Sequence, residues 1–465
     1  MCGIVGISGI PDAARLAYLG LYALQHRGQE SSGIVALDAD GVPRLHRGMG
    51  LVSDVLNNEA LAELPGDVAV GHTRYATMGS TVLENAQPLL AKYRGGPFAI
   101  AHNGNLTNAD GLRKELVASG SIFNSSSDTE TIVHLVARSQ ANDVEAQLRD
   151  ALSKVEGAYS LVVTVGRTMY AIVDPHGFRP LVIGRLGQGI IVASETCALD
   201  LLGATVVREL EPGDFVRISG GEVVPLAPLP RTSSVHRCVF ELVYFARPDS
   251  KVFGESVDRV RRELGRQLAR EHPAHNGQVV FSVPDSANAM ALGYSEVSGI
   301  RLEHGLIRNH YVGRTFIHPT QALRVEKVKI KFNPVREVIE GRSVVVVDDS
   351  LVRGTTSKGL VHMIRSAGAK EVHLRLGSPP ITGPCHYGID TPTREELIAS
   401  SHSTEEIREF LGVDSLGYLS LEGMLRAAGK SERFCHACFS GRYPVPVEDD
   451  IVKLRHASPM AASKA

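Results

Sequence analysis

The chain opens with Met1-Cys2-Gly3-Ile4-Val5-Gly6-Ile7, so a cysteine stands directly after the first methionine. Removal of Met1 would give one residue both a thiol and a free α-amino group. An α-amine has a pKa of about 8, so part of it is unprotonated near neutral pH and can take the thiol proton, directly or through one water molecule. The sequence therefore predicts that Cys2 is a nucleophile carrying its own base. An ordinary buried cysteine is the alternative.

Two halves of the chain show different patterns. Up to about residue 228 the sequence reads as short apolar strands between turns. The segment 225–234 holds three prolines, which remove backbone donors and disfavour both helix and central strand, so a domain boundary is expected there. After it, helical patterns alternate with apolar runs, which is typical of buried parallel strands between helices. We expect a sheet-rich domain over 2–228, an α/β domain over 235–445, and a tail over 446–465.

Composition places the chain among globular proteins. Its 465 residues are 43% hydrophobic and 22% charged, and 49 basic against 51 acidic residues give a formal net charge of −2. No overall field would attract nucleic acid or an anionic membrane, so any phosphate binding has to be local. The sequence shows neither the ~20 consecutive apolar residues of a transmembrane helix nor an N-terminal signal segment. A cytoplasmic location without nucleic-acid or membrane partners is expected.

A cysteine that attacks a carboxamide needs oxyanion donors and a grip on its substrate. Arg74 follows an apolar run, and its planar fork can bind an α-carboxylate with two hydrogen bonds. Asn103 and Gly104 offer a side-chain amide and a closely approachable backbone N–H as oxyanion donors, although Asn-Gly alone is more often a turn. Asp128 precedes a helical stretch, where it could accept from a substrate ammonium group or merely cap the helix.

Residues 344–359, VVVVDDSLVRGTTSKG, read as a buried strand, two acids and a small-residue loop that enters a helix. Backbone N–H groups of 354–357 at the helix start would hold a phosphate monoester. Asp348 and Asp349 would repel that phosphate unless they hold ribose hydroxyls or act through Mg2+. A phosphorylated sugar meets both demands, whereas the Gly-x4-Gly-Lys-Ser/Thr phosphate loop is absent. A plain connection between strand and helix is the alternative.

Six cysteines are too sparse for a disulfide scaffold in a chain of this length, which favours chemistry or metal binding. Cys435 and Cys438 have a spacing suited to one metal centre, and Cys238 and Cys385 could complete four ligands. On spacing alone, an iron-sulfur cluster, an all-cysteine zinc site and a thiol-redox pair fit equally well.

The N-terminal strings together resemble a class II glutamine amidotransferase domain of the N-terminal-nucleophile hydrolase fold. The matching segments are Cys2–Gly6, Gln25–Gly33, Gly71–Tyr75, His102–Gly104 and Ser127–Glu130. The resemblance implies an α+β fold, an αββα sandwich, in which Cys2 forms a γ-glutamyl thioester. It also implies glutamine binding by Arg27, Arg74 and Asp128, and oxyanion binding by Asn103 and Gly104.

The 344–359 stretch resembles the phosphoribosyl pyrophosphate signature of type I phosphoribosyltransferases, an α/β fold. The resemblance implies that Mg2+ lies near Ser286, Asp348 and Asp349. The residues implied to bind phosphoribosyl pyrophosphate are Asp348, Asp349, Ser350, Arg353, Gly354, Thr355, Thr356, Ser357, Arg314 and Lys331. The basic segment 309–333 resembles the loop that closes over the leaving pyrophosphate, with a solvated basic face as the alternative. Ala287, where glycine is usual, and His310, where a basic residue is expected, depart from the pattern.

The segments around Cys238, Cys385, Cys435 and Cys438 resemble the 4Fe-4S ligand segments of one branch of the amidophosphoribosyltransferases, which favours iron-sulfur over zinc. Such a cluster would join the two ends of the second domain, because Cys238 opens that domain and Cys435 and Cys438 close it. Its implied role is structural.

Over residues 2–445 the chain resembles that iron-sulfur-containing bacterial branch. The resemblance implies transfer of the amide nitrogen of glutamine to phosphoribosyl pyrophosphate, giving 5-phosphoribosylamine, pyrophosphate and glutamate in the first committed step of purine synthesis. It also implies a homotetramer, inhibition by purine nucleotides and a sheltered passage for ammonia. The family often carries a propeptide before the cysteine, whereas here we expect removal of Met1 alone to expose Cys2.

Two other functions stay open on the sequence. Another class II glutamine amidotransferase would share the first half but should lack the acids at 348–349 and their loop. A non-catalytic nucleotide-sensing protein of the phosphoribosyltransferase fold could keep that loop, but it would not need Cys2 or Arg74.

Overall fold

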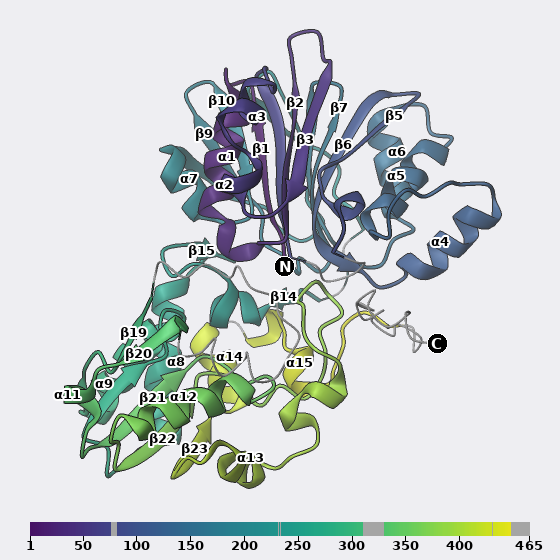
Figure 1. Ribbon diagram of the computed structural model, residues 1–465. Helices are drawn as coiled ribbons and strands as arrows, with labels where there is room; N and C mark the ends of the chain where they lie inside the picture. The colour runs from purple at the N-terminus through teal and green to yellow at the C-terminus, as the bar shows by residue number, and fades with distance from the viewer. Residues whose placement is uncertain (76–80, 231, 233, 310–329, 430, 448–465) are drawn as a thin grey trace, which may run out of the picture.

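Two antiparallel sheets lie face to face in the first half of the chain (Figure 1). The computed structural model describes residues 1–75, 81–230, 232, 234–309, 330–429 and 431–447. In sheet order, the first sheet consists of β11 Thr205–Glu209, β9 Val182–Leu186, β10 Gly189–Ala193, β1 Gly3–Ser8, β4 Val68–Arg74, β2 Ser31–Leu37 and β3 Pro43–Met49. The second consists of β13 Glu222–Pro225, β12 Phe215–Ser219, β8 Thr168–Val173, β7 Gly157–Val165, β6 Gly96–Leu106 and β5 Leu89–Tyr93.

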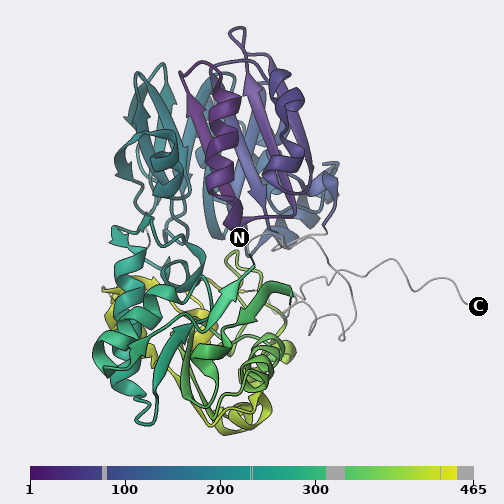
Figure 2. The same ribbon diagram turned by 60° about the vertical axis from the view of Figure 1, so that its left-hand side comes forward.

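The strands of this sandwich are apolar on both faces because both faces are covered. Successive strand residues point to opposite sides, so Val5 and Ile7 of β1 pack under α1 while Ile4 packs between the sheets. The helices over the first sheet are α1 Ala13–Ala23, α2 Val52–Val55, α3 Asn58–Ala62 and α7 Thr196–Leu202; those over the second are α4 Ala109–Ala118, α5 Thr129–Arg138 and α6 Val144–Leu152. Figure 2 shows α1 lying across the first sheet. The predicted αββα fold is confirmed.

A parallel sheet forms the centre of the second half. In sheet order its strands are β18 Arg301–Leu302, β17 Val279–Ser282, β21 Ser343–Asp348, β22 Glu371–Leu376 and β23 Ser415–Tyr418. Val345 and Val347 of β21 pack on one helical layer, and Val344 and Val346 pack on the other. The first layer contains α8 Val257–Glu271, α9 Asn288–Ser298 and α14 Leu421–Ala428, and the second contains α11 Arg336–Ile339, α12 Thr355–Ser366 and α13 Thr404–Leu411. The predicted α/β fold of this half is confirmed.

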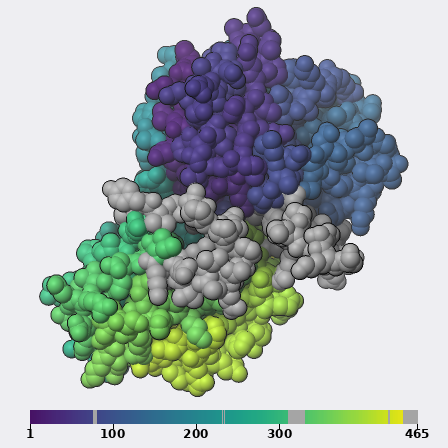
Figure 3. All heavy atoms as spheres, viewed as in Figure 1, coloured from purple at the N-terminus to yellow at the C-terminus, as the bar shows by residue number. Residues whose placement is uncertain are grey.

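Two short strands and a π-helix lie near the junction of the two halves. Strand β14, Arg237–Cys238, pairs in parallel with β24, Phe434–Cys435, so the beginning and end of the second half lie side by side. The π-helix η3, Glu241–Phe245, follows β14. The remaining short elements are β15 Lys251–Val252, β16 Glu255–Ser256, β19 Leu306–Arg308, β20 Phe332–Pro334, α15 Ala437–Ser440, η1 Gln25–Arg27, η2 Leu83–Asn85, η4 Arg394–Glu396, η5 Ile398–Ser400 and η6 Ser431–Arg433. In Figure 3 the first half, purple to blue, lies against the second, green to yellow.

In the described ranges, no helix combines the length and the apolar character that a membrane span needs.

Candidate active site

Cys2 lies directly before β1 and is held on both sides. Its backbone N–H donates to Asn103 Oδ1 over 3.2 Å, and its carbonyl accepts from Arg27 Nε over 2.9 Å. Its Sγ lies 3.9 Å from the carbonyl oxygen of Tyr75. The residue is buried, so the thiol occupies a defined position in a site that excludes most water.

Asn103 and Gly104 of β6 lie beside Cys2. Asn103 is completely buried, yet its Nδ2 has no hydrogen-bond partner among the residues that the structure describes. A Cβ at Gly104 would lie 2.0 Å from the carbonyl oxygen of Ala158, so glycine alone fits there. The structure thus brings the three predicted residues together and leaves an unsatisfied amide donor next to the nucleophile, which is the arrangement that an oxyanion hole requires.

Arg74 and Asp128 lie at the ends of the elements that carry them. Arg74 ends β4, is nearly buried, and lies 3.7 Å from Glu30. Asp128 precedes α5 but makes no side-chain capping bond to that helix; its Oδ2 instead accepts from the N–H of Leu106 over 2.9 Å. Because Leu106 ends the strand that carries Asn103, Asp128 is tied to the same strand as the oxyanion donors.

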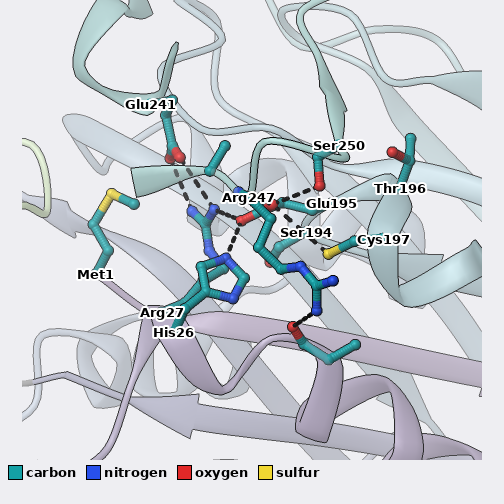
Figure 4. Close-up of polar contacts among 12 residues, drawn as sticks. Met1, His26, Arg27, Ser194, Glu195, Thr196, Cys197, Glu241, Arg247 and Ser250 are labelled. Carbon is teal, nitrogen blue, oxygen red and sulfur yellow. Dashed lines mark hydrogen bonds and ion pairs between the residues drawn. The ribbon is translucent and has the colours of Figure 1, made fainter. Parts of the chain in front are cut away.

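Buried charges meet at the junction of the halves (Figure 4). The terminal nitrogens of Arg27 donate to Glu241 over 2.8 and 3.1 Å and to Glu195 over 2.5 Å. Arg179 lies 3.3 Å from Glu241, and all four side chains are fully buried. Burial opposes the charged form of Arg27, but Glu241 and Glu195 raise its pKa above the ordinary value. Two positive and two negative charges therefore balance, which makes their burial tolerable.

The sequence predicted Arg27 as a glutamine ligand and missed Glu195, Glu241 and Arg179. The carboxylates that hold Arg27 come from 168 and 214 positions away in the chain. No local pattern marks such partners. The one available signal was the place of Glu241 in the segment that contains Cys238.

Two adjoining cavities connect the N-terminal residue with the predicted phosphate loop. A cavity of about 600 Å3 is lined by Met1, Arg27 and Tyr75 from the first half and by Asp285 and Arg308 from the second, among others. A cavity of about 500 Å3 covers the 348–357 loop. Both cavities have Tyr244, Phe245, Pro284, Ser286, Lys331 and Asp390 in their walls. The space beside Arg27 therefore adjoins the space over the two acids.

The predicted phosphate loop follows the carboxyl end of β21. Gly354, with φ +75°, caps α12, which begins at Thr355 and directs its first N–H groups toward this end of the sheet. Asp349 accepts from Ser286 Oγ over 2.5 Å and from Ser350 Oγ over 2.6 Å. Burial raises the pKa of Asp348 and of Asp349, and the charge of Asp349 adds to the shift of Asp348. A bound cation would offset the cost of keeping both carboxylates ionised.

Several other residues were predicted to bind phosphoribosyl pyrophosphate or to depart from the family pattern. Arg353 and Lys331 line the same cavity as Asp348 and Asp349. Arg314, together with His310 and most of the basic segment, lies outside the described residues. Ala287 is completely buried directly before α9.

The four predicted cluster cysteines line one small cavity. Cys238 is paired in register with Cys435. Burial raises the pKa of Cys238 to about 11 and holds the pKa of Cys435 and Cys438 above the ordinary value, with neighbouring cysteines adding to each shift. Four gathered thiols are the donor set of an iron-sulfur cluster or a zinc ion. As placed, however, no group of three or more His, Cys, Asp or Glu side chains in the described ranges is arranged to hold a metal ion, so the metal stays a prediction.

Comparisons with known proteins identify the family of the chain. Residues 72–201 match the family model of a glutamine amidotransferase domain. The chain is 51% identical over 456 residues to amidophosphoribosyltransferase 2, chloroplastic, of Arabidopsis thaliana, which covers 97% of this chain and 81% of that protein. It is 48% identical over 457 residues to the amidophosphoribosyltransferase of Bacillus subtilis, which covers 97% of this chain and 95% of that protein.

A solved structure supports the same relationship over the whole fold. The glutamine phosphoribosylpyrophosphate amidotransferase of Bacillus subtilis, complexed with ADP and GMP, matches with a TM-score of 0.91 and 47% identity, covering 97% of this chain and 99% of that chain. Identity of about half over nearly the full length is far above what a shared fold alone produces. The chain belongs to the amidophosphoribosyltransferase family.

Proposed function

We propose that this chain transfers the amide nitrogen of glutamine to phosphoribosyl pyrophosphate, giving 5-phosphoribosylamine, pyrophosphate and glutamate in the first step of purine synthesis. The observation that carries the proposal is the pair of adjoining cavities, one beside Arg27 and Tyr75, the other over the acids at 348–349. Ammonium predominates at neutral pH and is not nucleophilic, so ammonia made at one site reaches the other best through sheltered space.

In the first reaction, Cys2 acts after Met1 has been removed. Burial lowers the pKa of the α-amino group at Met1 to about 6. Cys2 is buried as well, so burial should also lower the pKa of the amine that removal of Met1 exposes and favour its unprotonated form. That amine takes the thiol proton, and Sγ attacks the carboxamide carbon of glutamine. Asn103 Nδ2 and the N–H of Gly104 would receive the oxyanion. The α-ammonium group then gives the thiol proton to the amide nitrogen, the C–N bond breaks, ammonia leaves, and a γ-glutamyl thioester forms. Water hydrolyses the thioester to glutamate and the free thiol.

Glutamine would be held by three residues around Cys2. Arg74 would bind the α-carboxylate, because a nearly buried guanidinium favours a planar anionic partner. Asp128 would accept from the α-ammonium group, since it is not used as a helix cap. Arg27 is the third proposed contact, and its Nε additionally binds the carbonyl of Cys2.

In the second reaction, ammonia attacks C1 of the ribose, the bond from C1 to the pyrophosphate oxygen breaks, and a proton leaves the new amine. The proposed ligands of phosphoribosyl pyrophosphate are Asp348, Asp349, Ser350, Arg353, Gly354, Thr355, Thr356, Ser357, Arg314 and Lys331. N–H groups at the start of α12 favour the 5′-phosphate. Mg2+, held by Ser286, Asp348 and Asp349, would supply positive charge for the leaving pyrophosphate.

A 4Fe-4S cluster held by Cys238, Cys385, Cys435 and Cys438 is part of the proposal. Its support is the small cavity that these four side chains line. Protein purified without oxygen should contain about four iron and four sulfide per chain. One equivalent of zinc, with neither iron nor sulfide, would show that the four cysteines form a zinc site instead of a cluster. If iron, sulfide and zinc were all absent, the proposed metal site would be wrong.

We also propose the domain limits 2–228 and 235–445 with a tail over 446–465, assembly as a homotetramer, a cytoplasmic location and feedback inhibition by purine nucleotides. The support for nucleotide inhibition is the Bacillus subtilis relative, whose structure is a complex with ADP and GMP.

The direct test is turnover of the purified chain with glutamine, Mg2+ and phosphoribosyl pyrophosphate under anaerobic conditions, following glutamate and pyrophosphate together. Equal release that Cys2→Ala abolishes with glutamine, but retains with ammonia, would establish the coupled reaction. Glutamate without pyrophosphate would instead mean another acceptor and another class II amidotransferase. Nucleotide binding without turnover would mean a sensing protein.

A further inference from the structure

Glu241 belongs to the second half of the chain but acts on a residue of the first. It begins η3, is fully buried, and binds both terminal nitrogens of Arg27 with its two carboxylate oxygens, over 2.8 and 3.1 Å. Arg27 in turn donates from Nε to the carbonyl of Cys2 over 2.9 Å. A continuous chain of contacts therefore runs from the second half to the nucleophilic residue.

Cys2 needs such a hold because of its place in the chain. Once Met1 is removed, Cys2 is a terminal residue that is covalently joined through its carbonyl carbon alone, and terminal residues move unless they are tied down. The bond from Arg27 fixes this carbonyl, and so helps to fix the position of Cα and the direction of the Cα–Cβ bond from which Sγ extends. Small displacements of a reacting atom cost large factors in rate.

The guanidinium of Arg27 keeps its orientation through its carboxylate partners. Glu195 reaches one terminal nitrogen of Arg27, whereas Glu241 reaches both. A guanidinium held at two nitrogens by one carboxylate is fixed in plane and direction. Without the charge of Glu241, Arg27 and Arg179 would also face each other with a single buried carboxylate, and their repulsion would turn Arg27 away.

We propose that Glu241 is a positioning residue for the glutaminase reaction: by holding Arg27, it lets the second half set the position of Cys2. The inference rests on the proposed function. The inference goes beyond the proposed function, because it places a residue that controls glutamine hydrolysis in the domain proposed to bind phosphoribosyl pyrophosphate.

The test compares Glu241→Gln with the wild type in two assays of the full chain. Glutamine-dependent kcat should fall at least about tenfold, because Glu241 positions the attacking residue. KM for glutamine should change less than about threefold, because two of the three proposed glutamine contacts, Arg74 and Asp128, do not depend on Glu241. Ammonia-dependent kcat should stay within about twofold, since that reaction does not use Cys2. The matched control is Glu211→Gln, which removes another carboxylate that pairs across the halves, with Arg237 over 2.6 Å, and should leave both activities unchanged.

The inference would be overturned if Glu241→Gln kept the wild-type glutamine-dependent kcat, or if its two activities fell in parallel. Coupled turnover by the wild type would still support the proposed function in either case. An inactive wild type would instead remove the proposed function. If Glu241→Gln does not fold, Glu241→Asp applies the same comparison. That variant keeps the charge but shortens the side chain by one methylene, so it should again lose glutamine-dependent activity selectively; loss of neither or both activities would contradict the inference.

Discussion

At the scale of single residues, the side-chain nitrogen Nδ2 of Asn103 is the atom that most clearly points to the proposed glutaminase reaction. A buried donor without a partner costs about 1–3 kcal/mol, so folded proteins rarely keep one without a use. Within the described part of the chain this nitrogen is unpaired, while the Oδ1 of the same side chain accepts from the N–H of Cys2. One amide thus holds the backbone of Cys2 through its oxygen, and its nitrogen is the donor that we propose for the substrate oxygen.

Asn103→Ala should lower glutamine-dependent kcat by about 10²–10³-fold, because it removes an oxyanion donor. Ammonia-dependent synthesis should continue at the wild-type rate. Steady-state kinetics with each nitrogen source measure both effects. Asn57→Ala, which removes an amide that caps α3, is the matched control. Glutamine-dependent kcat of Asn103→Ala within about twofold of the wild type would exclude this nitrogen from catalysis.

The pH dependence of the first reaction should report the α-amine of Cys2. Burial lowers the pKa of the α-amino group at Met1 to about 6. Cys2 is buried as well, and burial disfavours a charged amine, so its α-amine should have a pKa below the ordinary value once Met1 is removed. The base is active when unprotonated, so glutaminase kcat/KM should rise with pH and reach its plateau below the ordinary α-amine pKa of about 8. A profile of glutamate release against pH measures the midpoint. A midpoint at or above about 8 would show an amine exposed to solvent.

At the scale of elements, Glu130 of α5 holds the loop that precedes Asp128. It accepts from the N–H groups of Asn124 and Ser125, each over 2.8 Å. Burial acts to raise its pKa, but bonds from His134, Asn124 and Ser125 lower it to about 2. Because the folded pKa lies below the ordinary value, Glu130 stabilises the fold fully above about pH 4.5, and this contribution is lost as pH falls through about 2.

Glu130→Gln should therefore lower the free energy of unfolding by about 1–3 kcal/mol near neutral pH, and the difference from the wild type should shrink as the pH approaches about 2. Calorimetric Tm values of both proteins across that range measure the trend. A difference in Tm that stays constant down to about pH 2 would mean that the charge of Glu130 contributes nothing.

The segment 385–389 brings the second half against the oxyanion strand. Asn105 Nδ2 donates to the carbonyl of His386 over 2.9 Å, and a Cβ at Gly388 would lie 2.8 Å from the backbone carbon of Gly104. Gly388 also has φ +102°, which is unfavourable for any other residue. The backbone of the second half thus touches the strand that should bind the oxyanion.

Gly388→Ala should displace Gly104 and lower glutamine-dependent kcat by about tenfold or more, because an oxyanion donor moves. Gly299→Ala is the control: it has a similar φ of +72°, but its Cβ would meet no described atom within 4 Å, so it imposes strain without the clash. Kinetics and Tm of both variants separate the two effects. If Gly388→Ala and Gly299→Ala had equal activity and equal Tm, the proposed effect of the contact between Gly388 and Gly104 would be contradicted.

Local pattern was enough to predict the elements that carry local chemistry. The valine run before Asp348 and the small residues after it are contiguous, so the end of β21 and the start of α12 could be read directly. The partners of Arg27 could not, because they lie in other elements and in both halves. The closeness of Gly388 to Gly104 likewise depends on how the halves dock, which no periodicity encodes.

At the scale of the whole molecule, the two halves are joined at the proposed sites. Their cavities share walls, a charge network crosses their junction, and η3 begins with the residue that holds Arg27. The sequence resemblance predicted both sites and a sheltered passage for ammonia, but not the residues that join the two halves. The physical connection between them appears only in three dimensions, because it is built from side chains that are distant in the chain.

An isotope-transfer experiment tests whether ammonia passes from one half to the other without mixing with the solvent. The enzyme would be given amide-¹⁵N glutamine, phosphoribosyl pyrophosphate and Mg2+ in the presence of excess unlabelled ammonium, with Cys2→Ala as control. We predict that the wild-type product carries mostly ¹⁵N and the Cys2→Ala product none, because ammonia would pass between the two adjoining cavities. A wild-type product with the isotope ratio of the mixed external pool would contradict it.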